Sequence, residues 1–317
     1  MKKKILFAVK IAVGIGLIFW LIEKVNWNVV LLELREVSPF FLFLYVILQL
    51  SGNLISARKW QVIAEHKHRE LHFTVRQGFF TYLTGAFINN FLPSTIGGDA
   101  YRGLWLAKKT HAKAASISTV VFDRFIGLWT TAILALFFSF PLWKYFSSEV
   151  AVQIVLLSIG IFLFVDLFIT YAYFQVWFHR LISFLPFQVR RLIEEVIGFT
   201  KKGIWMKGSL YSVLFAFVGI AFSNYALFCA LGKNIDFLPY LSVIFIVTII
   251  SSVPLSINNI GIKEWAYFTF FPLIGVAPEA AVTVAILSRF LQMLISFIAL
   301  PQYVREESEK TPSRAIS

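Results

Sequence analysis

Long runs of apolar residues alternate with short polar segments along nearly the whole chain. A helix needs about 20 apolar residues, within a range of about 17–25, to cross the hydrocarbon core of a bilayer. Six uninterrupted runs meet this requirement, and the pattern therefore predicts six full transmembrane helices. Their ranges are Ile5–Ile22, Pro39–Ala57, Ala114–Leu142, Ala151–Phe174, Ser209–Leu231 and Pro278–Leu300.

Two further apolar stretches are interrupted near their middles. Gln77–Leu106 is interrupted at Pro93–Asp99, and Phe237–Val276 is interrupted at Pro254–Gly261. Both interruptions contain proline, glycine and polar side chains, which end helices and favour turns. Irregular backbone at membrane depth is tolerated only where it is buried in protein or lines a wet cavity. We therefore predict two broken, re-entrant helical hairpins that enter the membrane from opposite sides, in an arrangement like an inverted repeat.

The composition supports an all-α polytopic membrane protein. Hydrophobic residues make up 58% of the chain and charged residues 15%, with a mean hydropathy of +0.76. These values exclude an ordinary water-soluble enzyme and a disordered chain. The single cysteine, Cys229, excludes an intramolecular disulfide and a multi-cysteine metal site. The sequence also contains no phosphate-binding P-loop and no hydrolase nucleophile motif, so we expect neither an enzyme nor a bound cofactor or metal.

The distribution of basic residues predicts the orientation. Most of the 29 lysine and arginine residues fall on one side if the amino terminus is cytoplasmic and each broken hairpin returns to its side of entry. We therefore expect a multi-pass protein of the cell membrane with both termini in the cytoplasm. The net charge of +12 then reflects topology and attraction to anionic lipids, not nucleic-acid binding.

A single transmembrane domain is expected over residues 1–304, followed by a short polar cytoplasmic tail at 305–317. The longest polar connection, Gln175–Lys207, mixes apolar and basic residues in a pattern typical of an amphipathic helix. This helix is expected to lie on the cytoplasmic membrane surface, or alternatively to dock a partner protein.

Charged residues inside the predicted membrane helices are the first candidates for a functional site. A central charge costs about 2.5–3.5 kcal/mol on insertion scales, so it needs a partner or a wet cavity. Asp123 and Arg124 are adjacent and therefore point about 100° apart on a helix, so each needs a partner from another element. We expect Arg124 or Arg289 to pair with Asp99 or Glu264, and Asp123 with Arg102 or Lys263. For Asp123, an ion pair that only holds the bundle together is an equal alternative.

Guanidinium groups bind phosphate bidentately, and helix N-termini present N–H groups to anions. A phosphate-bearing lipid is therefore the ligand that these residues favour. The predicted headgroup-binding residues are Arg124, Arg289, Gly97, Gly98, Gly261 and Arg102. The residues expected to gate the site or to balance its charge are Asp99, Asp123, Lys263 and Glu264. The residues expected to support it are Asn90, Pro93, Ser94, Pro254, Ser256 and Asn258.

Three motifs together carry a family resemblance. They are Asn90-x-x-Pro93-x-x-x-Gly97-Gly98-Asp99-x-x-Arg102, Asp123-Arg124-x-x-Gly127, and Pro254-x-Ser256 followed by Gly261-x-Lys263-Glu264. On these motifs the chain, over residues 5–303, resembles the lysylphosphatidylglycerol synthase transmembrane-region family of flippase-like membrane proteins. In two-part members, such a domain moves aminoacylated phosphatidylglycerol between leaflets, and a separate soluble domain synthesises that lipid. We expect a stand-alone member without the soluble synthase domain.

The resemblance implies that the protein translocates, or helps to translocate, a phospholipid or polyprenyl-linked lipid. The alternative is a lipid-binding scaffold for a membrane glycosyltransferase or another lipid-modifying enzyme. A third possibility, an intramembrane enzyme using Asp99 and Asp123 as acid and base, has less support because no nucleophile or metal site accompanies them.

Overall fold

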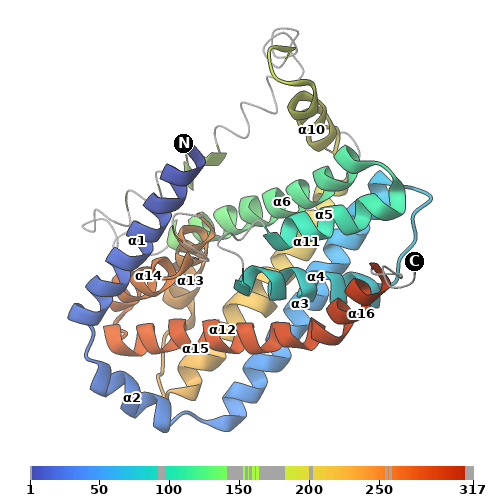
Figure 1. Ribbon diagram of the computed structural model, residues 1–317. Coiled ribbons are helices and arrows are strands. Elements are labelled where there is room, and N and C mark those ends of the chain that lie inside the picture. The colour runs from blue at the N-terminus through green and yellow to red at the C-terminus, as the bar shows by residue number, and fades with distance from the viewer. Residues whose placement is uncertain are drawn as a thin grey trace.

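The structure is a computed structural model that describes residues 2–91, 97–140, 153, 156, 159–160, 162–163, 183–199, 203–253, 256 and 259–310. Every regular element within these residues is a helix (Figure 1). In the first half the helices are α1 (Lys2–Lys24), α2 (Trp27–Arg35), α3 (Pro39–Lys67), α4 (Val75–Phe91), α5 (Gly97–Thr110) and α6 (Lys113–Ser139). In the second half they are α10 (Phe187–Ile197), α11 (Ile204–Phe215), the π-helical segment η3 (Ala216–Phe222), α12 (Ser223–Ala230), α13 (Phe237–Ser252), α14 (Ile262–Phe270), η5 (Phe271–Ile274), α15 (Pro278–Ser296), η6 (Phe297–Ala299) and α16 (Leu300–Lys310).

Four helices of the described chain are long and apolar enough to cross a membrane, namely Pro39–Lys67, Lys113–Ser139, Ile204–Ala230 and Pro278–Arg305. A fifth span is present if α1 and α2, which meet at 84°, count together. Most of the predicted span Ala151–Phe174 lies outside the described residues. The described residues therefore support a multi-pass helical membrane protein with four, or up to five, candidate spans, and the six full spans predicted from the apolar runs are not confirmed.

Both interrupted stretches form two helices that pack against each other, α4 with α5 and α13 with α14. Pro93, Ser94, Pro254 and Asn258 lie outside the described residues. The first hairpin is unusually close, because a Cβ atom placed on Gly98 would lie 2.1 Å from the carbonyl oxygen of Gly85. Glycine at both positions therefore lets the start of α5 touch the backbone of α4.

Local sequence signals explain where several of these helices begin. Thr74 and Gln77 form a reciprocal cap at the start of α4, where each backbone N–H donates to the side chain of the other residue, at 3.1 and 3.2 Å. Proline occupies the first turn of α3 and of α15. This position suits proline because the first N–H groups of a helix have no partner within it.

The two halves of the chain repeat the same order of helices. α3 and α11 begin 165 residues apart, at Pro39 and Ile204. The same offset of 165 separates the first residues of α5 and α14, at 97 and 262, and those of α6 and α15, at 113 and 278. Each half therefore contains a long helix, a broken hairpin and a second long helix at matching positions.

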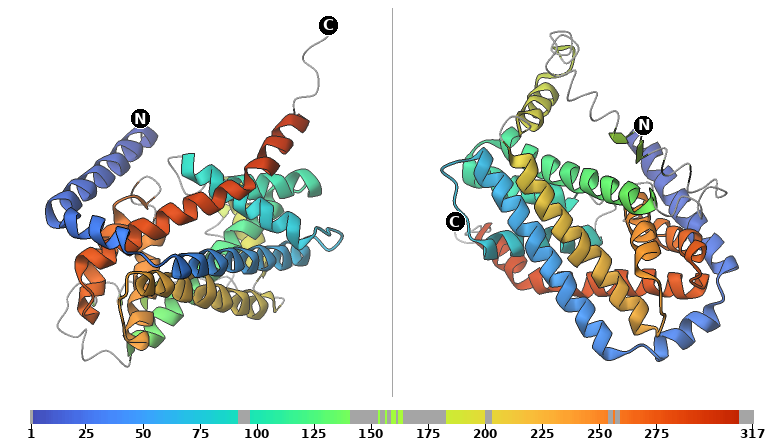
Figure 2. Two further views of the ribbon diagram at one scale, coloured as in Figure 1. Left: turned by 90° about the horizontal axis from the view of Figure 1, so that it is seen from below. Right: turned by 180° about the vertical axis from the view of Figure 1, so that it is seen from behind.

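The first long helices of the two repeats lie side by side and antiparallel (Figure 2). At one end, the N–H of Ser38 before α3 donates to the carbonyl of Ala230 in α12 at 3.0 Å. At the other end, Ile63 of α3 packs in one cluster with Ile204 of α11. Gly52 lies at the crossing, where an added Cβ would come within 2.6 Å of the Cα of Gly219. The first long helices of the two repeats therefore run in opposite directions.

Two short helices occupy matching places at opposite ends of the bundle. α2 packs on α15, and α10 packs on α6 (Figure 1). Lys233, after α12, pairs with Glu33 of α2 at 2.9 Å, and Lys67, at the end of α3, pairs with Glu195 of α10. Each long central helix is thus tied to the short helix of the other repeat. α10 lies within the stretch that was predicted to be amphipathic, and the adjoining Phe184 and the Phe187 of α10 are exposed.

The end of the chain differs in one respect from the expected polar tail. α16 continues the last span as a helix through Lys310, and residues 311–317 lie outside the described chain.

Candidate functional site

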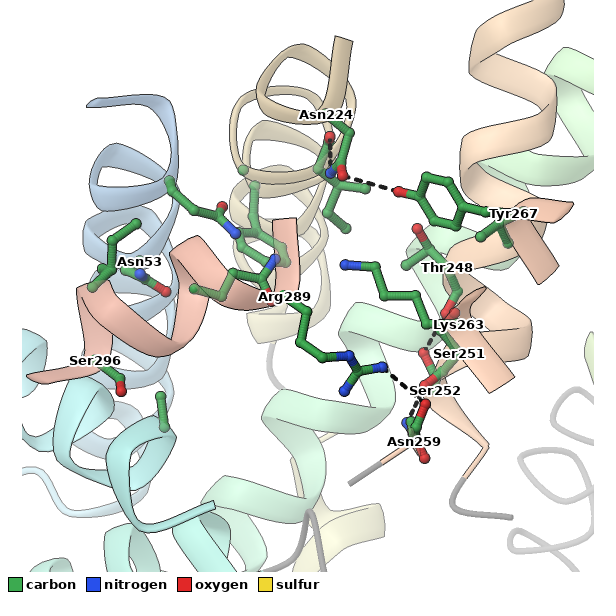
Figure 3. A pocket seen from close by; sticks show the side chains of 18 of the residues that line it. Asn53, Asn224, Thr248, Ser251, Ser252, Asn259, Lys263, Tyr267, Arg289 and Ser296 are labelled. Atoms are coloured by element: carbon green, nitrogen blue, oxygen red, sulfur yellow. Dashed lines mark hydrogen bonds between the residues drawn. The ribbon is translucent and has the colours of Figure 1, made fainter. Parts of the chain in front are cut away.

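A cavity of about 390 Å³ lies between the two repeats (Figure 3). Its walls come from α3, α4, α11, η3, α12, α13, α14 and α15, and polar side chains from most of these helices face it. The polar lining residues are Gln49, Asn53, Asn224, Thr248, Ser251, Ser252, Asn259, Lys263, Tyr267, Arg289, Gln292 and Ser296. The cavity therefore places hydrophilic groups inside a bundle whose outer surface is largely apolar.

Two basic side chains extend into this cavity from facing helices, Lys263 of α14 and Arg289 of α15 (Figure 3). The Lys263 ammonium donates to the hydroxyl of Ser288 at 2.6 Å, and no carboxylate of the described chain lies within ion-pair distance of it. Arg289 donates from Nε to Glu264 Oε1 at 2.8 Å and from Nη2 to the carbonyl of Asn259 at 3.0 Å. Among the described residues, Arg289 is therefore paired with a carboxylate, whereas Lys263 has none within ion-pair distance.

The start of α14 holds Glu264 in place. Gly261 has φ +85°, which favours glycine, and its N–H donates to Glu264 Oε2 at 2.9 Å. Glu264 is only 9% exposed, so its charge depends on these partners. The sequence had assigned the Gly261 N–H to an anionic ligand, but here the chain's own carboxylate accepts that hydrogen bond.

In the first broken hairpin, too, a side chain of the protein accepts a hydrogen bond from an N–H group that was predicted to bind a ligand. The N–H of Gly98 donates to Asn89 Oδ1 at 2.7 Å. Gly97 begins α5 one residue earlier, and the tight contact of Gly98 with Gly85 shields the helix start. The N–H of Gly98 is therefore bonded to α4 and is not available to a ligand.

Five charged residues of the first repeat form one connected network. Asp123 of α6 accepts from Lys59 at 3.0 Å and from Arg102 at 3.0 Å. Arg102 also pairs with Asp99 at 2.7 Å, and Asp99 pairs with Arg124 at 2.7 Å. The predicted pairs Asp123–Arg102 and Arg124–Asp99 are confirmed, as is Arg289–Glu264. The need of Asp123 for a partner on another helix is met twice.

Lys59 is the member of this network that the sequence did not identify. Like its neighbour Arg58, it belongs to the basic residues whose distribution predicts the orientation, yet its side chain is buried against Asp123. Nothing in the local sequence separates the two residues, because they differ only in the face of α3 on which they lie.

The structure also removes Arg102 from the headgroup-binding set. Its side chain is 3% exposed and lies between two carboxylates, with the ring of Tyr82 4.3 Å away and that of Trp60 5.4 Å away. The guanidinium is therefore almost completely enclosed by side chains of the protein. Arg124 is different, since its side chain is 56% exposed, but it does not line the cavity.

The residues of the ion network have equivalents in the second repeat, on the helices that line the cavity. The offset of 165 residues relates Asp99 to Glu264 and Arg124 to Arg289, and both carboxylate–arginine pairs are present. The same offset relates the other network members to neutral residues, namely Lys59 to Asn224, Arg102 to Tyr267 and Asp123 to Ser288. Tyr267 donates to Asn224 Oδ1 at 2.9 Å, so neutral hydrogen bonds replace ion pairs beside the cavity.

Two of the residues that were predicted to support the site, Asn90 and Ser256, form hydrogen bonds close to the cavity. Asn90 of α4 donates to Ser296 Oγ at 2.7 Å, and Ser256 donates to the carbonyl of Ile260 at 2.8 Å across the second break. The sequence did not single out Asn224, Thr248 or Tyr267 as site residues. The only feature that could have pointed to them is a polar side chain within an apolar run. Such side chains are common inside helices for another reason, because they also form hydrogen bonds with the backbone of their own helix.

Residues 7–299 match the family model described as Lysylphosphatidylglycerol synthase TM region. Over 115 residues the chain is 34% identical to the UPF0104 membrane protein MJ1595 of Methanocaldococcus jannaschii, a stretch that makes up 36% of this chain and 32% of that protein. The chain thus matches about a third of that relative's length. Because the family model spans nearly all of its helices, the chain belongs to the lysylphosphatidylglycerol synthase transmembrane-region family of membrane proteins.

Proposed function

We propose that this protein translocates, or helps to translocate, a phosphate-bearing lipid between the leaflets of the cell membrane. The lipid would move without chemical change. The observation that carries the proposal is the pair of basic side chains, Lys263 and Arg289, inside a polar cavity beside a broken helix. In transporters built from inverted repeats, substrate sites lie at the repeat interface and are formed by discontinuous helices.

The headgroup would enter the cavity while its acyl chains stay in the bilayer. Lys263 would contact the phosphate first, because its ammonium is bonded to the Ser288 hydroxyl and not, among the described residues, to a carboxylate. Arg289 would then bind the phosphate while Glu264 keeps the guanidinium oriented. The cost of burying a phosphate is offset only where such cations are already desolvated and in place.

The ion network of the first repeat would close one side of the route that the headgroup takes through the protein. Lys59, Arg102 and Asp123 are all buried, and their bonds join α3, α5 and α6. Alternating access requires one side to stay sealed while the other admits the headgroup, and rocking of one repeat against the other is the general means. Asp99 and Arg124, at the more exposed edge of this network, would be the first pair to separate.

The test is lipid movement in vesicles that contain the purified protein. Phosphatidylglycerol labelled with NBD on an acyl chain is present in both leaflets, and dithionite bleaches only the outer leaflet. The protein is expected to expose the inner pool to dithionite, and Arg289→Gln is expected to slow this exposure by roughly tenfold to a hundredfold. This range corresponds to losing one charge-assisted contact of about 1.5–3 kcal/mol.

Two further variants separate function from folding. Arg289→Gln leaves Glu264 without its arginine, so the double variant Glu264→Gln/Arg289→Gln removes both charges and is expected to fold but not to move lipid. Arg69→Gln, on the exposed turn after α3, is the matched control and is expected to keep the wild-type rate. Wild-type movement by the double variant would exclude Arg289 from the path. Tight lipid binding with no movement by the unmodified protein would instead favour the scaffold for a lipid-modifying enzyme.

A further inference from the structure

We infer that the cavity opens sideways into the hydrocarbon of the membrane, between the end of α13 and the middle of α15. A membrane lipid would place its headgroup in the cavity through this opening while its acyl chains stay in the bilayer. The inference rests on the proposed function and adds the place where the lipid enters. Three observations support it: the exposure of two lining residues, their depth in the membrane, and the apolar side chains around them.

Two of the described lining residues are exposed, Ser252 at the end of α13 and Gln292 in α15. The other described lining residues are buried or half-buried. On α15, Arg289 is half-buried one turn before Gln292, and Ser296 is buried one turn after it. Within the part of the chain that the structure describes, the cavity therefore reaches the surface where Ser252 and Gln292 lie.

Hydrogen bonds hold the end of α13 close to α15. Arg289 Nη2 donates to the carbonyl of Asn259 at 3.0 Å, and the Asn259 amide donates to the carbonyl of Ser251. Figure 3 shows the guanidinium of Arg289 directed towards Asn259 and Ser252. Gln292 follows Arg289 by three residues, which is about 4.5 Å along the helix axis. Arg289 therefore lies just inside the opening, where it would meet the phosphate of a lipid whose chains remain outside.

The exposed side chain of Gln292 lies at the depth of the hydrocarbon. In the candidate span Pro278–Arg305, Gln292 comes 14 residues after the first residue and 13 residues before the last. A polar group at this depth needs a partner in the protein or a wet cavity, because lipid chains form no hydrogen bonds. Since Gln292 both lines the cavity and is exposed, the cavity meets the surface of the protein at the middle of the span.

The surface beside the opening is apolar. Met293 and Leu294 follow Gln292 and are 40% and 47% exposed, and Val253 follows Ser252 and is 44% exposed. Contiguous apolar side chains on a surface mark a contact with a membrane or with another protein. At the middle of a membrane span, the molecules that meet them are acyl chains. The surroundings of the opening therefore suit lipid rather than bulk water.

A sideways opening also suits the physical chemistry of a lipid. Every CH₂ group that leaves hydrocarbon for water costs free energy, so a lipid keeps its chains in the bilayer throughout the movement. Only the headgroup needs polar surroundings, and the amides of Asn53 and Asn224 are among the groups that supply them. An opening between the polar cavity and the bilayer satisfies both parts of the lipid at once.

The first experiment measures whether the opening meets lipid. In a Cys229→Ser background, a bimane label is attached at Gln292→Cys in vesicles. Iodide quenches the label from water, and phosphatidylcholine with a doxyl group on its acyl chain quenches it from the bilayer. Leu54→Cys is the matched control, because Leu54 is 46% exposed near the middle of the span Pro39–Lys67 and does not line the cavity.

We expect the doxyl lipid to reduce the fluorescence at both positions equally, and iodide to reduce it more at Gln292 than at Leu54. Weaker quenching by the doxyl lipid at Gln292 than at Leu54 would place the opening away from the bilayer and overturn the inference. Equal quenching of the two labels by iodide would show that no polar opening lies at Gln292, and would overturn it as well.

The second experiment measures whether headgroups use the opening. Gln292→Trp places a large ring in it, and we expect NBD-labelled phosphatidylglycerol to become accessible to dithionite about tenfold more slowly. Leu54→Trp adds the same ring on the surface of α3 and should keep the wild-type rate. Wild-type movement by monodisperse Gln292→Trp protein would overturn the inference while lipid translocation stands. If the unmodified protein moves no lipid, the proposed function fails, and the quenching experiment still decides where the cavity opens.

Discussion

Arg289 and Glu264 are 25 residues apart, and Nε of the arginine lies 2.8 Å from Oε1 of the glutamate. Arg124 and Asp99 have the same separation in the other repeat, and their contact is 2.7 Å. In both cases the carboxylate lies in the first turn of the helix that resumes after a break, where the helix dipole favours a negative charge. Each pair therefore ties a broken hairpin to the following long helix.

Removing the carboxylate of Glu264 should destabilise the second hairpin. Glu264→Gln can still accept from the N–H of Gly261 but loses the ion pair with Arg289, so we expect a loss of about 1.5–3 kcal/mol. Glu264→Ala also loses the cap, which adds about 1 kcal/mol. Thermal unfolding in detergent is expected to give the highest unfolding temperature for the wild type, a lower one for Glu264→Gln and the lowest for Glu264→Ala. Equal unfolding temperatures for all three would show that the pair contributes nothing.

Asp123 should be among the most sensitive positions in the first repeat. Asp123→Asn leaves Lys59 and Arg102 buried without their shared carboxylate, and breaking a buried ion pair costs about 3–5 kcal/mol. Glu194→Gln is the control, because its pair with Arg190 at 3.8 Å is exposed and such pairs contribute about 0–1 kcal/mol. Chemical unfolding in detergent compares the two. A smaller loss for Asp123→Asn than for Glu194→Gln would refute the role given to the network.

The contact between α4 and α5 should not tolerate a single methyl group at Gly98. The added Cβ would lie 2.1 Å from the Gly85 oxygen, so Gly98→Ala must separate the two helices, at a cost of about 1–3 kcal/mol or more. Gly16→Ala in α1 adds the same group where nothing lies within 4 Å. We expect this control to be neutral or slightly stabilising, since alanine favours helix over glycine. Expression and unfolding temperature of the two variants measure the difference.

The inverted repeats should place equivalent residues on opposite sides of the membrane. Arg69 follows α3 and Asn234 follows α12, they are related by the repeat offset, and both are exposed. In a Cys229→Ser background, Arg69→Cys is expected to react with a membrane-impermeant maleimide only from the cytoplasmic side, and Asn234→Cys only from outside. Labelling of both from the same side would contradict the inverted arrangement.

Much of the architecture was predictable from local pattern. The apolar runs, the two interruptions and the basic asymmetry are each readable over 10–30 neighbouring residues, because a bilayer demands about 20 apolar residues per helix. The predicted partners of Asp123, Arg124 and Arg289 were also correct, since a charge in an apolar span requires a partner and few candidates exist. The number of full spans could not be predicted in the same way. A bent pair of helices such as α1 and α2 has the same composition as one straight span.

The order of apolar and polar residues is enough to predict a helical membrane protein with two broken hairpins and a small set of charges that need partners. Which of these charges are paired and which face a cavity depends on the packing of helices that are distant in the chain. Lys59 is buried and Arg58 beside it is not, and the N–H groups of Gly98 and Gly261 are bonded within the chain. The reason is physical: burial and hydrogen-bond partners depend on how distant helices pack, and residues 165 apart come to equivalent places only after both repeats have folded.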